Sequence, residues 1–369
     1  MHIRKVSINM EVRNVKKILM VTESMGGGVL TYLAQLCNSL ADDFDIYLAY
    51  SLRNEISPDY KTRLSSKIHL IELKYLGSKP ITNIPNMFRV VKEFRQLEKN
   101  LSPDLIHLHS SIAGFFGRLA FNGRNNTVIY TPHGYAHVLS GPCMRSRIYR
   151  LVEKLLGYRN CITLTCCASE DEEAKTLTSK TAYIETGLDT SRLSRTLNNI
   201  QPTKQGKFTV FSLGRIVRQK RPDLFNKIAA LVPEAKFIWI GGGPLSHELT
   251  APNIEITGWM PREEALAIAK GADAFILCSY GEAIAMSLLE NMYLGKLALV
   301  SNTMGNKSVI RNGINGWLCE TPEDYAEKIR EAMTNFPANI TQSAQQSIEN
   351  TYNMEAMKRK FIEYYSSLS

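Results

Sequence analysis

The chain has 369 residues, of which 44% are hydrophobic, and its 44 Lys and Arg outnumber 35 Asp and Glu, for a net charge of +9. This length is sufficient for two domains with full cores. No apolar run approaches the roughly 18 residues that span a bilayer, and residues 1–13 lack the apolar core of a signal peptide, so we expect a cytoplasmic protein. The basic excess contains no dense Lys and Arg tract and no recognition motif, which argues against a nucleic-acid partner.

The first predicted strand, residues 17–21, leads into a glycine cluster that includes Gly27 and Gly28 and precedes an apolar helical pattern. A strand, a glycine-rich loop and a helix together invite a dinucleotide-binding interpretation. That fingerprint fails because Thr31 occupies its third glycine position and no convincing acidic strand end follows. The glycine pair is therefore either a ligand contact or an ordinary turn at a helix entry.

Two further predicted strands, residues 104–109 and 127–131, also end in polar residues. His133 follows the second of them beside Gly134, which frees the backbone to turn, so it is the best functional candidate among the nearby histidines. Local hydrogen bonding explains His109 better. We expect no metal site, because no carboxylate or Cys completes a familiar ligand spacing around these histidines.

In the second half, residues 208–213 form a predicted strand that ends at Gly214, and Arg215 and Lys220 project from the following loop. Open α/β sheets bind ligands beyond the carboxyl ends of their strands. An Arg in that place grips phosphate oxygens as a fork, and a Lys binds them as a point charge. The alternative is a solvated basic loop.

The next predicted strand, residues 237–240, leads into a triple glycine that ends at Gly243 and is followed by Pro244. Chain and ligand can approach closely here because no Cβ intervenes. An ordinary exit from a strand has the same composition. The order of a cationic turn and a glycine turn along one chain favours a ligand site.

The most informative stretch is residues 279–292, in which Glu282 and Glu290 bracket seven residues. It follows a predicted strand, and we expect a helix to begin near Ala283. Such a helix directs free N–H groups and the positive end of its dipole at the strand end, where an anionic group such as a phosphate can bind. Two carboxylates beside a phosphate site suit a nucleotide sugar, because each accepts hydrogen bonds from vicinal hydroxyls. A helix-terminal charge and a solvated Glu are the alternative.

Strands alternate with helical patterns in both halves, which predicts an α/β chain with two doubly wound parallel sheets. We place the linker near residues 195–206, which are polar and rich in turn formers. The positive charge is concentrated in residues 51–150, which hold 15 Lys and Arg against 6 Asp and Glu. Two candidate amphipathic helices lie there or at its edge, one around Phe88 and one around residues 144–155. This regional charge favours contact with an anionic membrane over a reading in which the apolar residues are core.

Four motifs in chain order resemble those of the family-4 retaining glycosyltransferases of GT-B fold, and the resemblance covers nearly the whole chain. The motifs are Gly214-Arg215 with Lys220, the triple glycine with Pro244, Glu282 with Glu290, and Gly313, Gly316 and Trp317. The chain departs from the family pattern where Ala283, Ile284 and Ala285 follow the first Glu, where Ser308 stands in place of a frequent carboxylate, and where Thr186 replaces a usual Asn.

The resemblance implies a GT-B fold, in which two Rossmann-like domains with doubly wound parallel sheets face a cleft. We expect an acceptor-side domain over residues 1–198 and a nucleotide-sugar-binding domain over residues 199–351. The terminal helix, residues 352–369, is expected to cross back onto the first domain, as it does in the family.

The resemblance also implies roles for single residues. By this resemblance, Arg215 and Lys220 hold the donor diphosphate. Glu290 holds the ribose, Glu282 contacts the transferred sugar near its 3-hydroxyl, and His133 contacts the 6-hydroxyl of the sugar. The expected catalytic residues are Glu282, His133, Arg215 and Lys220. The expected nucleotide-binding residues are Gly27, Gly28, Gly214, Arg215, Lys220, Gly243, Ala283, Ile284, Ala285 and Glu290.

The resulting functional hypothesis is retaining, metal-independent transfer of a hexose or N-acetylhexosamine from a nucleoside diphosphate sugar, by family frequency a UDP-sugar, with no cofactor. The expected acceptor is a saccharide linked to a lipid such as undecaprenyl diphosphate, at the cytoplasmic face of the inner membrane, in O-antigen, capsule or exopolysaccharide synthesis. The alternatives are a nucleotide-sugar 2-epimerase of the same fold and a catalytically silent nucleotide-sugar-binding partner.

Overall fold

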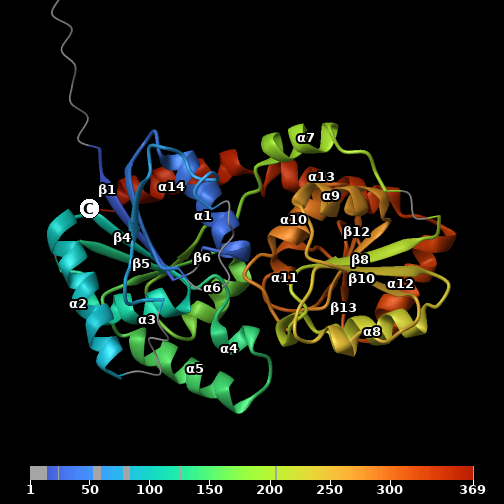
Figure 1. Cartoon of the computed structure of the whole chain (residues 1–369), viewed down its shortest axis with the longest axis horizontal. Helices are drawn as coiled ribbons and strands as arrows, with labels where there is room; N and C mark the ends of the chain where they lie inside the picture. The colour runs from blue at the N-terminus through green and yellow to red at the C-terminus, as the bar shows by residue number, and fades with distance from the viewer. Residues whose placement is uncertain are drawn as a thin grey trace, which may run out of the picture.

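The computed structural model describes residues 15–23, 25–52, 60–77, 84–124, 126–203 and 206–368. Within these ranges the chain forms two α/β units side by side, each with a parallel sheet between two layers of helices (Figure 1). The sequence prediction for residues 1–13 lies outside the described residues. No described helix is both long enough and apolar enough to cross a membrane.

The first unit contains seven parallel strands in the order β3-β2-β1-β4-β5-β6-β7. The strands are β1 (Lys17–Thr22), β2 (Asp45–Tyr50), β3 (His69–Glu72), β4 (Leu105–His109), β5 (Thr127–Thr131), β6 (Ile162–Thr165) and β7 (Thr181–Tyr183). The helices are α1 (Gly27–Leu40), α2 (Ile84–Leu101), α3 (Ser111–Ala120), α4 (Ala136–Leu139), α5 (Met144–Leu156) and α6 (Ala168–Lys175). The strand order reverses between β1 and β4, and open α/β sheets bind ligands outside the carboxyl ends of the strands at such a point.

Helix α7 (Thr190–Asn198) leads to the second unit, whose six parallel strands have the order β10-β9-β8-β11-β12-β13. The strands are β8 (Thr209–Leu213), β9 (Lys236–Ile240), β10 (Ile254–Gly258), β11 (Ala274–Leu277), β12 (Leu297–Ser301) and β13 (Trp317–Cys319). The helices are α8 (Pro222–Leu231), α9 (Arg262–Gly271), α10 (Met286–Tyr293), α11 (Asn306–Val309), α12 (Pro322–Thr334) and α13 (Ala338–Asn350), with short 3-10 turns η1 (Arg218–Lys220) and η2 (Ser246–Glu248). A further helix, α14 (Met354–Ser367), follows them along the chain. Here the order reverses between β8 and β11, which carry the predicted motifs on their carboxyl ends.

The alternation of side chains along the central strands explains why each sheet has a core on both faces. In β1, Ile18 and Met20 pack in one buried cluster with α1, whereas Leu19 and Val21 pack in a second cluster with α2 and α3. Successive side chains of a strand point to opposite faces, so a continuous apolar run builds both layers at once. The strands β4, β11 and β12 are accordingly buried at every residue.

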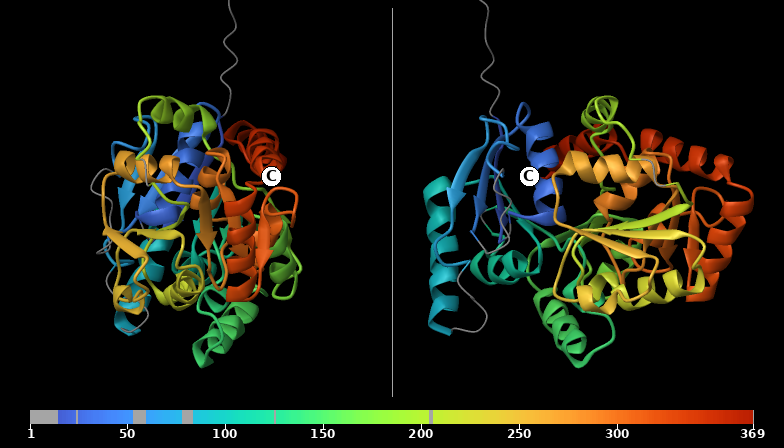
Figure 2. Two further views of the ribbon diagram at one scale, coloured as in Figure 1. Left: turned by 90° about the vertical axis from the view of Figure 1, so that its right-hand side faces the viewer. Right: turned by 45° about the vertical axis from the view of Figure 1, so that its right-hand side comes forward.

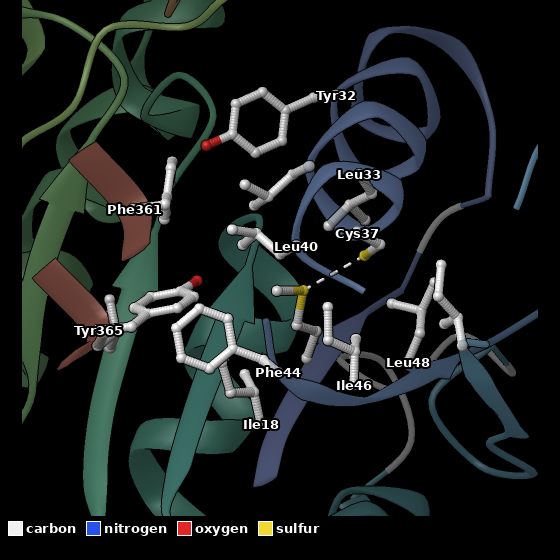
Figure 3. Close-up of a cluster of buried hydrophobic side chains, with 14 of the residues drawn as sticks. Ile18, Tyr32, Leu33, Cys37, Leu40, Phe44, Ile46, Leu48, Phe361 and Tyr365 are labelled. Atoms are coloured by element: carbon white, nitrogen blue, oxygen red, sulfur yellow. Dashed lines mark hydrogen bonds between the residues drawn. The ribbon is translucent and has the colours of Figure 1, made fainter. Parts of the chain in front are cut away.

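The last helix, α14, packs against the first unit rather than the second (Figure 2). Its Met357, Phe361 and Tyr365 join the cluster formed by α1 and the first sheet (Figure 3). The Tyr365 ring contacts Phe44 edge-on, with ring centroids 5.6 Å apart. Burial of three large side chains at roughly 2 kcal/mol each makes this helix an integral part of the first core.

One local prediction was wrong. The helix expected near Ala283 begins at Met286, with Ala285 as its N-cap residue. Residues 281–285 stay non-helical, because the Glu282 N–H donates to the Met304 carbonyl oxygen at 3.1 Å and ties this segment to a neighbouring loop. Glu290 consequently lies about one turn into the helix instead of two. Residues 195–198 of the expected linker form the end of α7.

Candidate active site

The loops after β8 and β9 touch at the carboxyl edge of the second sheet. The Gly214 carbonyl oxygen accepts a hydrogen bond from the Trp239 indole at 2.9 Å. A Cβ added at Gly241 would lie 2.3 Å from that oxygen, and one at Gly243 would lie 2.3 Å from the Ile216 carbonyl oxygen. Glycine at both positions is therefore what allows the two loops to approach this closely.

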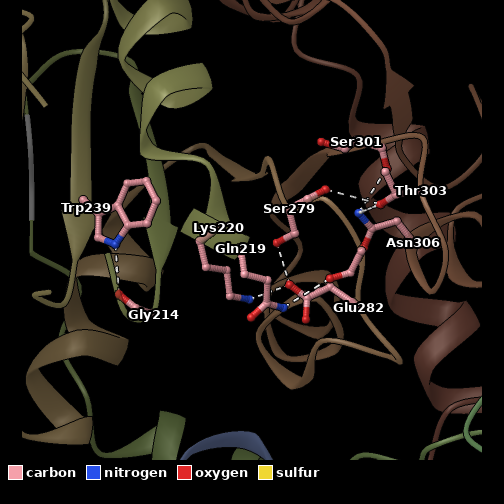
Figure 4. Close-up of polar contacts among 10 residues, drawn as sticks. Gly214, Gln219, Lys220, Trp239, Ser279, Glu282, Ser301, Thr303 and Asn306 are labelled. Carbon is pink, nitrogen blue, oxygen red and sulfur yellow. Dashed lines mark hydrogen bonds and ion pairs between the residues drawn. The ribbon is translucent and has the colours of Figure 1, made fainter. Parts of the chain in front are cut away.

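The predicted Lys220 and Glu282 meet directly at the same edge. The Lys220 Nζ lies 2.7 Å from the Glu282 Oε1, which also accepts a hydrogen bond from the Ser279 hydroxyl at 2.5 Å (Figure 4). Gln219 reinforces the contact, because its side chain donates to the Gly281 carbonyl oxygen at 3.2 Å. The Glu282 side chain is only 11% exposed and that of Lys220 only 17%. A largely buried ion pair thus joins the turn after β8 to the loop after β11.

Glu290 forms a second ion pair, which sequence reasoning missed. Its Oε1 lies 2.7 Å from the Arg262 Nη2, and Arg262 is the first residue of α9. The carboxylate is 9% exposed while the Arg side chain is 52% exposed, so the pair lies at the solvent boundary. The pairing depends on two residues far apart along the chain, and only the cationic start of a helix could have hinted at it.

Arg215 directly follows Gly214 and is exposed, on the same loop that carries Lys220. Gly27 and Gly28 form the first turn of α1, after the N-cap residue Gly26. Both are exposed, and a Cβ added at either would meet nothing within 4 Å. α1 touches α10 of the second unit, so the glycine turn belongs to a helix that borders the same interdomain region.

The segment Ala283–Ala285 runs from Glu282 to the start of α10. Ala283 and Ala285 are buried at 8% and 7% exposure, whereas Ile284 is half-buried. Small side chains here let the segment pass close to the first unit, whose Cys167 thiol donates to the Ala283 carbonyl oxygen at 3.2 Å. The free N–H groups of the first turn of α10 follow immediately.

On the first unit, His133 lies at the carboxyl end of β5 within a group of histidines. Its Nε2 is 3.0 Å from the His109 Nδ1, and its Nδ1 is 3.5 Å from the Cys166 sulfur. The Tyr32 ring of α1 contacts it edge-on, with ring centroids 4.5 Å apart. His133 itself has a φ of 54°, an unusual conformation for a residue with a side chain.

The histidines of this group are neutral. Burial lowers the pKa of His133 to about 3, and it also holds the pKa values of His107 and His109 well below their ordinary range. The Thr131 hydroxyl donates to the Leu164 carbonyl oxygen, so it accepts from the His107 Nε2 at 2.8 Å. The neutral His107 therefore accepts at Nδ1 from the Tyr365 hydroxyl at 2.6 Å.

Backbone strain accumulates at these strand ends. Positive φ angles occur at Ser110 (76°) after β4, at His133 after β5 and at Arg221 (53°) after Lys220. Such conformations persist where the surroundings fix them, and they cluster at functional sites. Glu23, directly after β1, is a further residue that the sequence did not single out. Its carboxylate accepts hydrogen bonds from the Ser110 hydroxyl and from the Ala113 N–H, which caps the start of α3.

Among the described residues, no group of three or more His, Cys, Asp or Glu is arranged to hold a metal ion. The predicted polar residues include two ion pairs and the exposed Arg215 on the second unit and neutral imidazoles on the first. The fold defines a protein of two Rossmann-like α/β units, with charged groups at the carboxyl edge of the second sheet.

Comparisons with known proteins identify the family. A family model for glycosyl transferases group 1 matches residues 194–354, and one for glycosyltransferase family 4 matches residues 26–192. The chain therefore belongs to the family-4, group 1 glycosyltransferases, and it is a glycosyltransferase of GT-B fold.

Two curated relatives come from Escherichia coli. A UDP-Gal:alpha-D-GlcNAc-diphosphoundecaprenol alpha-1,3-galactosyltransferase is 28% identical over 65% of this chain and 68% of its own length. The O-antigen biosynthesis glycosyltransferase WbnH is 24% identical over 82% of this chain and 86% of its own length.

Two solved structures share the fold. Sucrose-phosphate synthase from Thermosynechococcus elongatus superposes with a TM-score of 0.78 at 17% identity, over 95% of this chain and 98% of its own. Anabaena Alr3699/HepE, in complex with UDP and glucose, superposes with a TM-score of 0.72 at 18% identity, over 96% of this chain and all of its own.

Proposed function

We propose that this chain is a retaining glycosyltransferase of bacterial polysaccharide synthesis that moves a hexose or N-acetylhexosamine from a UDP-sugar to a lipid-linked saccharide, without a metal. The name of the galactosyltransferase relative specifies a UDP-sugar donor and a diphosphoundecaprenol-linked acceptor, and the Anabaena structure contains UDP and glucose. Both support a UDP-sugar donor for this chain, and the name of the relative supports a lipid-linked acceptor.

The observation that carries the proposal is the contact between Lys220 and Glu282 at 2.7 Å, beside the start of α10. A diphosphate bound there competes with Glu282 for the ammonium, because phosphate is the stronger acceptor with more charge. The carboxylate is then released to accept hydrogen bonds from the hydroxyls of the sugar. One ion pair in the protein thus becomes two contacts to the donor, one at each side of the bond that breaks.

In the proposed reaction, Lys220 and Arg215 stabilise the negative charge that develops on the departing diphosphate, a role that a metal ion has in other enzymes. Glu282 is already held by Lys220 and the Ser279 hydroxyl, which suits a carboxylate that orients the sugar more than a nucleophile. The acceptor hydroxyl attacks on the face that the diphosphate leaves, and the leaving phosphate oxygen takes its proton. The anomeric configuration is thereby retained.

His133 orients the sugar from the opposite unit. Its Nε2 lies 3.0 Å from the His109 Nδ1, whereas its Nδ1 has the longer contact of 3.5 Å to the Cys166 sulfur. The Nδ1 is thus the ring nitrogen that a sugar hydroxyl can engage. A neutral imidazole suits this task, because a cation at this position would compete with Lys220 for the diphosphate.

Glu290 is the proposed ribose contact. Its carboxylate is held at the solvent boundary by Arg262. Two vicinal hydroxyls can donate to one carboxylate, and the Arg can remain paired with the other oxygen.

We also propose that α5 brings the enzyme to the cytoplasmic face of an anionic membrane. This helix buries only Glu153 and Leu156, and it protrudes at the edge of the first unit (Figure 2). Four of its large apolar side chains are 55–70% exposed, namely those of Met144, Ile148, Leu151 and Leu155. Interspersed among them are the basic residues Arg145, Arg147, Arg150 and Lys154. An exposed apolar stripe with basic neighbours suits insertion between anionic headgroups.

Helix α5 can expose its apolar face because a buried contact anchors it. The Arg118 Nη2 lies 2.8 Å from the Glu153 Oε2, and the Tyr130 hydroxyl donates to the Glu153 Oε1 at 3.0 Å. Burial within the first core, the alternative for these apolar residues, does not apply to α5. On α2, Phe88 is 74% exposed while Phe94 is fully buried, so only the start of that helix presents an apolar face.

Vesicle co-sedimentation tests the membrane proposal. The substitutions Leu151→Glu and Leu155→Glu together should abolish binding to anionic vesicles, while Ile314→Glu, at an exposed position of the second unit, should leave it unchanged. Equal binding by the α5 double variant and the wild type would contradict the membrane role of this helix.

The catalytic proposal is tested by incubating the enzyme with a panel of UDP-sugars and a diphospholipid-linked saccharide in EDTA. We expect transfer from one donor with retention of the anomeric configuration, measured by NMR of the product. An inverted product, or loss of activity in EDTA, would contradict the proposed mechanism. Conversion of the donor to an epimer without an acceptor would identify a 2-epimerase instead, and binding without turnover would identify a silent partner.

A further inference from the structure

The first turn of α6 lies between the two units and contacts both of them. Ser169 forms three hydrogen bonds to the second unit. Its hydroxyl oxygen accepts from the Gly305 N–H at 2.9 Å and from the Ser308 hydroxyl at 2.7 Å, and its N–H donates to the Ser308 oxygen at 2.9 Å. Ser169 is 6% exposed, so these bonds are shielded from water.

Each hydroxyl and thiol proton of Ser308, Ser169 and Cys167 has an acceptor in this cluster. The Ser308 hydroxyl gives its proton to Ser169, so Ser169 directs its own proton at the Cys167 sulfur, 3.5 Å away. The Cys167 thiol in turn donates to the Ala283 carbonyl oxygen at 3.2 Å. Ser308 must act as donor and acceptor at once. A carboxylate at position 308 would accept but could not donate.

On its second-unit side, this cluster reaches the backbone of Glu282, the residue proposed to orient the sugar. A Cβ added at Gly305 would lie 2.5 Å from the Glu282 carbonyl oxygen and 2.3 Å from the Ala283 carbonyl oxygen. The Glu282 N–H also donates to the Met304 carbonyl oxygen. The backbone that Ser169 binds is therefore packed directly on the backbone of Glu282.

On its first-unit side, the same turn holds the histidine loop. The Glu170 carboxylate accepts from the Gly134 N–H at 2.7 Å and from the Cys166 N–H at 2.8 Å. Glu170 is fully buried. Gly134 follows His133, and both have positive φ angles, of 90° and 54°. The carboxylate thus fixes the strained turn that presents His133.

We propose that Cys167, Ser169 and Glu170, which we call the α6 turn, are positioning residues that set His133 relative to Glu282 across the two units. This inference rests on the proposed function, because it assigns the two groups to one sugar. The α6 turn acts through other residues and touches no substrate itself. Ser308 is the matching part on the second unit, because its hydroxyl both donates to and accepts from Ser169.

The test compares Ser308→Ala, Ser308→Thr and Glu172→Gln. Alanine removes both bonds of the hydroxyl, threonine keeps a hydroxyl, and Glu172 pairs with Lys307 across the same seam on the exposed surface at 3.4 Å. We expect Ser308→Ala to lower kcat by roughly tenfold to a hundredfold through misplacement of reacting groups. Its Kd for UDP should stay within about twofold, since Lys220, Arg215 and Glu290, the side chains proposed to hold the diphosphate and the ribose, all lie on the second unit. Ser308→Thr should restore most of kcat, and Glu172→Gln should resemble the wild type.

Wild-type kcat in Ser308→Ala would overturn the inference, as would equal losses of kcat and UDP affinity, which would indicate a merely structural role. If the wild type transfers sugar from none of the UDP-sugars, the proposed function is wrong. Small-angle scattering without substrate then tests whether the α6 turn holds the two units together. The α6 turn then predicts a larger radius of gyration for Ser308→Ala than for Ser308→Thr or Glu172→Gln. Equal radii would overturn the inference.

Discussion

At the carboxyl edge of the first sheet the functional candidates are neutral imidazoles that bond to one another, whereas at the second sheet they are ion pairs. His133 and His109 share a hydrogen bond of 3.0 Å, while Lys220 and Glu282 form a contact of 2.7 Å between opposite charges. This difference indicates which part of the donor each edge can bind. Neutral donors and acceptors suit hydroxyls, and paired charges can be parted by a diphosphate that carries charge of its own.

The second edge is also the more sensitive of the two to truncation. Removing one partner of a largely buried ion pair leaves a desolvated charge behind, which is costly. The first edge loses only neutral hydrogen bonds, worth about 1 kcal/mol each.

The largest effect is expected for Lys220→Ala. Loss of the ammonium removes charge stabilisation at the leaving diphosphate and should lower kcat by about a hundredfold to a thousandfold. Steady-state transfer assays measure this loss. Lys236→Ala is the matched control, because Lys236 pairs with Glu255 at 2.7 Å at the amino end of β9. Similar rates in the two variants would remove Lys220 from the mechanism.

A smaller effect is expected for His133→Ala. Loss of one contact to a sugar hydroxyl should lower kcat by roughly tenfold to a hundredfold, because a hydrogen bond that orients the sugar is lost. The same assay applies, with His69→Ala as the control, since His69 lies on the exposed edge strand β3. A decrease of kcat as large as that of Lys220→Ala would contradict the assignment of the sugar to the first edge and of the diphosphate to the second.

Glu290→Gln should weaken UDP binding by about tenfold, because a neutral amide replaces the charged acceptor of the ribose hydroxyls. Calorimetric titration with UDP measures the change, and Glu255→Gln serves as the control. A wild-type Kd for UDP in Glu290→Gln would mean that Glu290 pairs with Arg262 but does not bind the ribose.

Acid should destabilise the protein through the first edge. His107, His109 and His133 have lowered pKa values, so the unfolded chain binds more protons than the folded chain as the pH falls below about 6.5. Glu170 opposes this trend, because burial raises its pKa to about 7 and the folded chain takes up its proton first. Three imidazoles outweigh one carboxyl, so the free energy of unfolding should fall between pH 7 and pH 5. Urea titrations check this, and a rise over that interval would contradict the neutral histidine group.

The sequence was sufficient for the architecture and for the residues at strand ends. Alternating apolar strands and helices predicted both sheets, and the fold class and the family are confirmed by the strand orders and the family models. Residues such as Lys220 could be singled out because a cation just past a strand end is a local pattern. Their roles in the site remain predictions.

The contacts between distant segments could not be read from the sequence. The pairing of Glu290 with Arg262 and the hydrogen bonds of Ser169 with Ser308 join residues separated by 28 and 139 positions. The start of α10 was predicted too early for the same reason. The Met304 carbonyl oxygen, from a distant loop, accepts a hydrogen bond from the Glu282 N–H and keeps this segment out of the helix. Packing between segments, rather than local propensity, decides these features.

Calorimetric titration of UDP into the wild type, Lys220→Ala and His133→Ala in EDTA tests most sharply whether Lys220 binds the diphosphate while His133 contacts the sugar. We expect the wild type to bind, His133→Ala to bind within about twofold of it, and Lys220→Ala to bind about a hundredfold more weakly, through the loss of a buried charge-assisted contact. Equal Kd values for Lys220→Ala and the wild type, or a wild type that binds no UDP in EDTA, would contradict this assignment.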